Sequence, residues 1–185
     1  MAIKTFTTGE VLTAADTNTY LANSGLVYVG QFSTTSGTAV TSPTVFSSTY
    51  DNYRIVINNM ESGSPGGGYY LAMGSSSSGS QHYMGGFYVN TGVPAITPIG
   101  RSNLGNWIIG TGDAGQKFST ALDICSPNLA SRTNLPVVNM YSENGFIGVG
   151  AGHQNSTTQF TTFTLSSAGA TFSSGTITVY GYRKG

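Results

Sequence analysis

Hydrophobic and polar residues alternate in short runs along most of this chain, and that pattern predicts half-buried β-strands. In Tyr53–Asn59 the residues Tyr53, Ile55 and Ile57 fall on one face. A glycine- and serine-rich turn, SGSPGGG at 62–68, separates this run from Tyr69–Met73, which has the same alternation. The two runs therefore predict a β-hairpin with a loose tip.

Other alternating runs, each bounded by Gly, Asn, Ser or Pro, predict further strands. They are Leu26–Phe32, Tyr83–Asn90, Trp107–Ile109, Phe118–Ile124, Val137–Tyr141, Phe146–Ala151, Thr158–Leu165 and Thr176–Tyr182. Residues 33–43 predict a hinge or an open edge strand, and residues 91–106, which hold Pro94 and Pro98, predict a long loop. Strand spacing near a dozen residues, without helical or repeat periods, favours an antiparallel β-sandwich of jelly-roll type over βαβ units or a β-helix.

Only the stretch from Phe6 to Val29 indicates a helix. Thr13 is a suitable N-cap with Asp16 three residues later, and Gly25 suits the helix end. A helix of about ten residues is not stable alone in water. The predicted helix and the residues around it contain too few apolar side chains for a core of their own. We therefore expect residues 1–29 to form an arm that anchors the protein to a partner, and residues 30–185 to form the β domain.

The same stretch resembles the N-terminus of tailed-bacteriophage virion surface proteins of the tail-fibre, minor-tail or head-fibre type. The matching pattern is an aromatic residue (Phe6), GEVLTAAD at 9–16, NxYL at 18–21 and GLVY at 25–28. YDNYRIVI at 50–57 and GTITVYGYRKG at 175–185 are looser matches.

The resemblance implies a homotrimeric structural protein on the virion surface that docks on capsid or tail proteins through residues 1–29. The apolar residues expected to anchor it are Phe6, Val11, Leu12, Tyr20, Leu21 and Leu26.

Charged residues make up only 8% of the chain, against about 25% in ordinary proteins, and the formal net charge is zero. Nucleic acids and anionic membranes select basic surfaces, so we expect neither as a partner. The 38% hydrophobic content is too high for a disordered chain, despite 26 glycines. A surface with so few charges is most easily tolerated within an assembly or an obligate oligomer.

The single cysteine, Cys125, excludes an intrachain disulfide framework and fits assembly in a reducing host cytoplasm. Residues 1–6 contain no apolar run of signal-peptide length, and no run reaches the 18 apolar residues of a membrane span. We therefore expect no secretory signal and no membrane insertion.

Sequence motifs for catalysis or cofactors are weak. Gly110–Gly115 reads G-x-G-x-x-G, but the next residues have a strand period where a dinucleotide site needs a helix, so a turn is expected. His82 and His153 have no acidic or cysteine neighbours at metal-ligand spacing. We expect no catalytic residue, metal or cofactor, although two of the seven acids could form a glycosidase pair.

Aromatic residues flank the predicted long loop: Tyr83, Tyr88 and Trp107. Aromatic ring faces beside Asn and Gln side chains suit the binding of a carbohydrate or protein receptor. The alternative role for these three rings is packing in the core or between subunits. Tyr180 and Tyr182, opposite Ile177 and Val179 in the last strand, are better suited to subunit packing. The sequence thus predicts a short phage fibre or spike that mediates host attachment; alternatives are a capsid decoration (cement) protein and, ranked lower, a glycan-hydrolysing spike.

Overall fold

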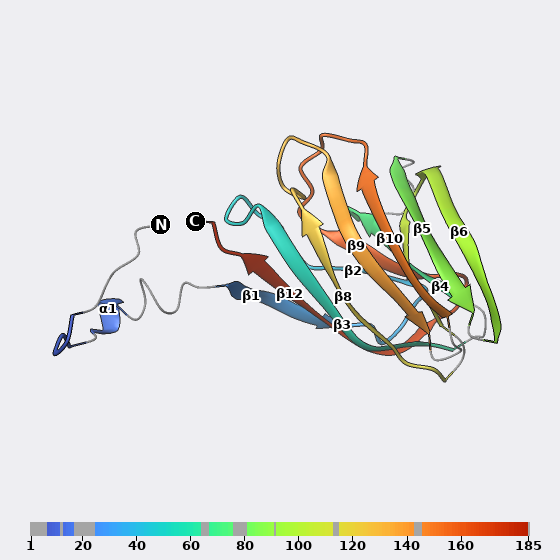
Figure 1. Cartoon of the computed structure of the whole chain (residues 1–185), viewed down its shortest axis with the longest axis horizontal. Coiled ribbons are helices and arrows are strands. Elements are labelled where there is room, and N and C mark those ends of the chain that lie inside the picture. Colours follow the sequence, from blue (N-terminus) through green and yellow to red (C-terminus); the bar gives the residue numbers. More distant parts are fainter. Residues whose placement is uncertain are drawn as a thin grey trace.

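Antiparallel β-strands make up most of this protein in a computed structural model (Figure 1). The structure describes residues 7–11, 13–16, 25–63, 67–75, 81–90, 92–112, 115–142 and 146–184. Its strands are β1 (Leu26–Ser33), β2 (Ala39–Thr41), β3 (Asn52–Ser62), β4 (Gly67–Met73), β5 (His82–Asn90), β6 (Val93–Leu104), β7 (Trp107–Gly112), β8 (Phe118–Cys125), β9 (Thr133–Ser142), β10 (Phe146–Gln154), β11 (Phe163–Ser167) and β12 (Phe172–Tyr182).

The strands form two sheets. One sheet has eight strands in the order β1-β12-β3-β8-β9-β10-β5-β6, and the other has four in the order β2-β11-β4-β7. All the registered strand pairs are antiparallel, as the alternating sequence runs predicted. The mainly antiparallel β class is therefore confirmed.

Four strand pairs are nested within one another along the chain. The first strand, β1, pairs with the last, β12, and β2 pairs with β11. Inside these, β3 pairs with β8 and β4 pairs with β7. The hairpins β5–β6 and β9–β10 are inserted into this nested series and extend the larger sheet beyond β8.

One hydrophobic core joins the two sheets. Tyr69 of β4 contacts Phe118 of β8 and Phe172 of β12, with ring centroids 5.2 Å and 6.2 Å apart. Phe163 of β11 contacts Phe32 of β1 at 5.8 Å. These aromatic side chains bridge the sheets at several points, and such pairs add about 0.5–1.5 kcal/mol each beyond the area they bury.

Two local sequence predictions were wrong. The runs Tyr53–Asn59 and Tyr69–Met73 do not form a hairpin, because they lie in β3 and β4, which belong to different sheets. Residues 91–106 were predicted as a loop, but most of them form β6. This strand lies at an edge of the larger sheet, where proline is tolerated because one side of the strand has no ladder to complete.

The structure describes only the start of the N-terminal stretch that was predicted to be helical. Ala14–Asp16 form one helical turn, α1, and the rest of the predicted helix, residues 17–24, lies outside the described residues. Gly25 has a positive φ of 101°, and β1 begins at the next residue. Leu26, Val27 and Tyr28 pair with β12, so strand β1 starts four residues before the predicted boundary at residue 30.

The stretch Gly110–Gly115 was predicted as a turn, but its first three residues form the end of strand β7, and residues 113–114 lie outside the described residues. Gly115 has a positive φ of 78°, and a strand, β8, follows, in agreement with the predicted strand period. Gly110 itself has a packing role: a Cβ added there would lie 2.2 Å from Cε2 of Phe118. The missing side chain lets the ring of Phe118 lie directly against the backbone of β7.

We expect Gly110→Ala to destabilise the protein by about 1–3 kcal/mol, because the added methyl group overpacks a buried ring. Gly85→Ala is the matched control, since a Cβ at that glycine meets nothing within 4 Å and neither glycine has a positive φ. Urea unfolding of the two variants and the parent protein measures the difference. Equal stability of the two variants would contradict this account of the core.

Candidate interaction surfaces

The outer face of the eight-stranded sheet is the main candidate surface. In β12 the core-facing residues Ile177 and Val179 are fully buried, whereas Tyr180 and Tyr182 are only partly buried, as the alternation predicted. The strand register places their neighbours: Tyr28 of β1 and Arg54 of β3 both pair with Tyr180, and Asp123 of β8 pairs with Arg54. These residues define the polar half of the outer face.

This tyrosine cluster, made of Tyr28, Arg54, Asp123, Tyr180 and Tyr182, is held by charge-assisted hydrogen bonds. The Arg54 guanidinium donates two parallel hydrogen bonds to Asp123, Nε to Oδ1 at 2.9 Å and Nη2 to Oδ2 at 2.8 Å. The Tyr182 hydroxyl donates to Asp123 Oδ1 at 2.7 Å. The Arg54 guanidinium also lies 5.9 Å from the centroid of the Tyr182 ring, so the ring next to the ion pair is that of Tyr182. Tyr28, at the β1 end of the cluster, lies edge-on to Tyr180 at 6.2 Å and is 60% exposed.

The charges of this cluster alter one another's titration. The hydrogen bonds from Arg54 lower the pKa of the Asp123 carboxyl, and the hydroxyl of Tyr182 lowers it further. The hydrogen bonds with Asp123 also raise the pKa of Arg54. Burial, followed by the hydrogen bond to Asp123, raises the pKa of Tyr182. The carboxylate is therefore ionised and engaged at neutral pH.

The other half of the outer face, on β9, β10, β5 and β6, carries a group of apolar side chains beside Asn139 and the stacked rings of Tyr83 and His153. Several of its side chains are exposed: Ile96 is 72% exposed, Ile147 55%, Val137 51% and Phe87 46%. We call the apolar patch the set of outer-face residues Phe87, Val89, Ile96, Pro98, Val137, Ile147 and Val149. Single exposed apolar side chains are ordinary, but a contiguous group of this kind marks an interaction site.

The predicted receptor-facing residues do not form one site. Trp107 is fully buried, and its Nε1–H donates to the backbone oxygen of Tyr83 at 3.1 Å, so it belongs to the core and not to a receptor surface. Tyr83 and Tyr88 are five residues apart in β5 and therefore lie on opposite faces of the sheet. Tyr83 is on the outer face, where its ring stacks on His153 with centroids 5.0 Å apart.

Of the predicted anchoring residues, the structure describes Val11 and Leu26. Val11 is 79% exposed, and Leu26 is the first residue of β1 with its side chain 41% exposed. The other four, Phe6, Leu12, Tyr20 and Leu21, lie outside the described residues.

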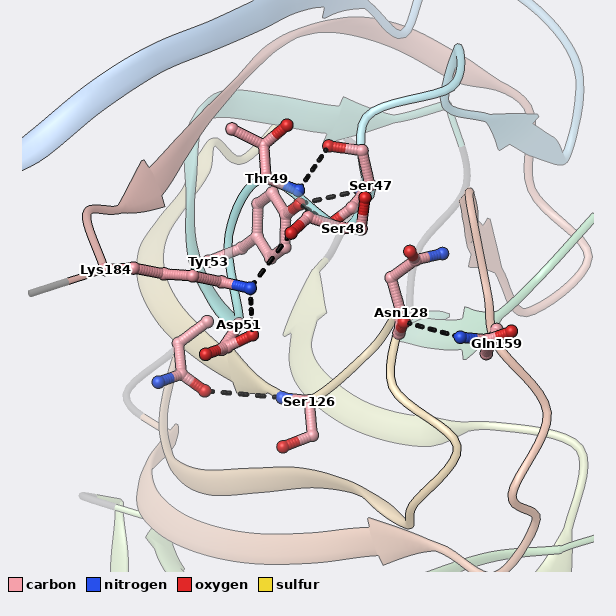
Figure 2. A network of polar contacts seen from close by, with 10 residues as sticks. Ser47, Ser48, Thr49, Asp51, Tyr53, Ser126, Asn128, Gln159 and Lys184 are labelled. Atoms are coloured by element: carbon pink, nitrogen blue, oxygen red, sulfur yellow. Dashed lines mark hydrogen bonds and ion pairs between the residues drawn. The ribbon is translucent and has the colours of Figure 1, made fainter.

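A network of polar contacts lies at the end of the domain near Lys184, beyond the last strand (Figure 2). Lys184 donates to the backbone oxygen of Ser48 at 2.9 Å and forms an ion pair with Asp51 at 2.7 Å. The Tyr53 hydroxyl accepts from Ser47 N at 2.8 Å and donates to Ser47 O at 2.9 Å. A shallow pocket of about 300 Å³ lies here, lined by Val27, Thr49, Tyr50, Arg183 and Lys184.

His82, one of the two histidines, is a structural residue. It is 2% exposed and lies edge-on to Trp107. Its Nε2 accepts a hydrogen bond from Met73 N at 3.1 Å, and its Nδ1 lies 3.3 Å from the Leu104 backbone oxygen, to which it donates. Among the described residues, no three His, Cys, Asp or Glu side chains are grouped so that they could hold a metal ion.

Cys125 lies in β8, half-buried, and burial raises the pKa of its thiol. The fold thus favours the protonated thiol over the nucleophilic thiolate at this position. Within the described part of the chain, no helix has the length and apolar character needed to cross a membrane.

Comparisons with family models, curated proteins and solved structures gave no match for this chain.

We expect Asp123→Asn to lower stability at neutral pH by about 1 kcal/mol or less, because the ion pair is partly exposed to water. The pKa of Asp123 is lower in the folded chain than its ordinary 3.8, so its stabilisation is full above that value. As the pH falls through the lower, folded-state pKa, the carboxyl is protonated and the difference between variant and parent should close.

Urea unfolding between neutral pH and about pH 2.5 measures this closure. Ala121→Asn, on the same face of β8, is the matched control, since its effect involves no titrating group and should stay constant with pH. A pH-independent effect of Asp123→Asn would show that the charge of Asp123 contributes nothing.

Proposed function

We propose that this chain is a structural protein of a tailed-bacteriophage particle. It is a short fibre or spike, homotrimeric and held on the virion by its N-terminal arm, and its β domain mediates attachment to the host without a catalytic step. The observation that carries the proposal is the pattern at 6–28, which resembles the N-termini of phage virion surface proteins.

The strand order supports the corresponding fold. The four nested pairs β1–β12, β2–β11, β3–β8 and β4–β7 are what results when one long antiparallel hairpin is folded over into two sheets. This is the connectivity of a jelly-roll sandwich, an architecture used in viral capsid and lectin domains. We propose that the domain is a jelly roll whose larger sheet is widened by the β5–β6 and β9–β10 hairpins.

The described part of the arm suits attachment to a partner. Residues 7–11 and 13–15 are exposed in the single chain, and they include the large apolar side chain of Val11. Since β1 begins at Leu26, we assign the anchor to residues 1–25 and leave the rest of the predicted arm to the domain. Its partners are capsid or tail proteins of the particle.

The tyrosine cluster supports the receptor-binding part of the proposal. The exposed ring of Tyr28 and, across β12 on the same face, the fixed arginine and carboxylate offer stacking area together with hydrogen-bonding groups, which suits a host-surface glycan or protein. We therefore propose the tyrosine cluster as the receptor site in place of Trp107, whose side chain is fully buried and cannot contact a receptor.

The apolar patch favours one alternative, a capsid decoration protein that binds across neighbouring shell subunits. An exposed apolar sheet face gains stability when another protein covers it, and a shell offers such a partner. Loss of a decoration protein should make heads leak DNA, whereas loss of an attachment protein should leave heads intact and reduce adsorption to cells.

Gold-labelled antibody against this protein should bind intact phage particles in electron micrographs, because the proposal places the β domain on the outside. Label at the tail favours host attachment, and label on the head favours a head fibre or a decoration protein. Absence of label from particles that were purified from a producing culture would contradict the virion assignment.

In the full chain, Val11→Asp should reduce incorporation into particles by about tenfold or more, because it places a charge in an apolar contact. Val11 is 79% exposed in the free protein, so the variant should fold like the parent. Thr8→Asp, an exposed position in the same segment, is the matched control for the added charge. Quantitative immunoblots of purified particles measure incorporation, and equal incorporation of both variants would overturn the anchor assignment.

A further inference from the structure

The apolar patch lies on strands with almost no charge. Strands β5, β9 and β10 contain no Lys, Arg, Asp or Glu, and β6 contains only Arg101. The guanidinium of Arg101 lies over the ring of Tyr70 at 5.1 Å from the ring centroid, so it is engaged with β4 of the smaller sheet. Edge strands such as β6 are protected from pairing by charged side chains or by proline, and β6 has Pro94 and Pro98 for this purpose. Its outward face, in contrast, carries no charge that would oppose contact with another apolar surface.

The strand register places large side chains of the patch in one row and small residues in the next row. Phe87 of β5 pairs with Pro98 of β6 and with Val149 of β10, so the three side chains form a ridge across three strands. Two residues along each strand, Gly85 pairs with Gly100 and Ala151, and this row has almost no side chains. A Cβ added at Gly85 or Gly100 would meet nothing within 4 Å, so the space above this small-residue row is open.

We propose that the apolar patch binds a second copy of this chain. A ridge beside an open row on the same face is self-complementary, because the ridge of each copy can enter the small-residue row of the other. Such a face-to-face contact has two-fold symmetry and joins two copies, so it is separate from the contacts that would hold the proposed homotrimer together. The patch carries no charge that could pair with a charged partner, so an uncharged surface fits it best, and a second copy offers one. The net charge of the chain is zero, so two copies do not repel one another.

The size of the face sets the expected strength. Four strands spaced about 4.8 Å apart, each contributing about six residues at 3.4 Å per residue, span roughly 19 by 20 Å. An area of roughly 400 Å² is an ordinary size for the largest exposed patch of a monomer, and two copies that cover it bury roughly 800 Å² in total, less than a stable interface buries. The purified protein should therefore associate reversibly, in the micromolar range, and not as a permanent complex.

Sedimentation velocity of the full chain, from low to several hundred micromolar, should show concentration-dependent association. Phe87→Glu should weaken the association constant by about tenfold or more, because an ionised carboxylate would be buried without a partner. Gly85→Leu should do the same by filling the small-residue row, whereas Gly85→Ala should have a smaller effect. Ile147→Glu, at a position 55% exposed, serves if Phe87→Glu fails to fold.

Leu26→Glu is the matched control, since Leu26 is 41% exposed on the outer face but lies in β1, at the opposite edge of the same sheet. A parent protein that stays monomeric over the whole range overturns the inference. So does association that Phe87→Glu, Ile147→Glu and Gly85→Leu leave unchanged, because another surface would then join the copies.

This inference does not depend on the proposed function, since self-association is measured on the purified chain without particles. Association lost in Phe87→Glu, combined with absence from phage particles, would leave the inference standing and remove the virion assignment. Presence on phage particles, combined with a purified chain that stays monomeric, would leave the virion assignment standing and remove the inference.

Discussion

The pairing of the first strand with the last is the constraint on which this domain depends. Strand β1 lies at an edge of the larger sheet, and its only neighbour there is β12, which pairs with β3 on its other side. Each nested pair inside this one also brings together segments far apart in the chain, so the core contains residues from both ends of the domain. Such long-range pairing must offset a large loss of chain entropy before the core is complete, which predicts slow folding for a chain of this length.

The nested pairs and the inserted hairpins divide the outer face of the larger sheet. The pairs β1–β12 and β3–β8 carry the tyrosine cluster, in which Asp123 receives hydrogen bonds from both Arg54 and Tyr182. The inserted hairpins β5–β6 and β9–β10 carry the apolar patch. The proposed receptor surface and the proposed self-association surface thus lie on different parts of one sheet, and the hairpins inserted in the nested series carry the surface that lacks charge.

Period-two alternation was enough to predict the β class, most strand positions and the two faces of β12. Sequence spacing could not tell which strands are neighbours, and so Tyr53–Asn59 and Tyr69–Met73 were joined as a hairpin although they lie in different sheets. Pro94 and Pro98 indicated a loop because a sequence does not show that its strand is at an edge.

The candidate surfaces were harder to predict than the fold. Trp107 combines a large ring with loop-like neighbours, and only the position of β7 within the core shows that it is buried. The tyrosine cluster joins residues from four strands, and its key contact, between Arg54 and Asp123, spans 69 positions of the chain. The one available signal was the alternation that placed Tyr180 and Tyr182 opposite Ile177 and Val179. The sequence also contains a signal for the apolar patch, the stretch from Gln81 to Gly100, which has no charged residue.

The two ends of the domain are tied together, since the backbone N–H of Arg183 donates to the oxygen of Gly25 at 3.4 Å. Any peptide fused after the last residue would therefore emerge beside the arm, next to whatever surface the arm binds. Cargo meant for display would be better inserted at a hairpin turn far from this bond, such as the short connection between β5 and β6, where both flanking strands are already paired.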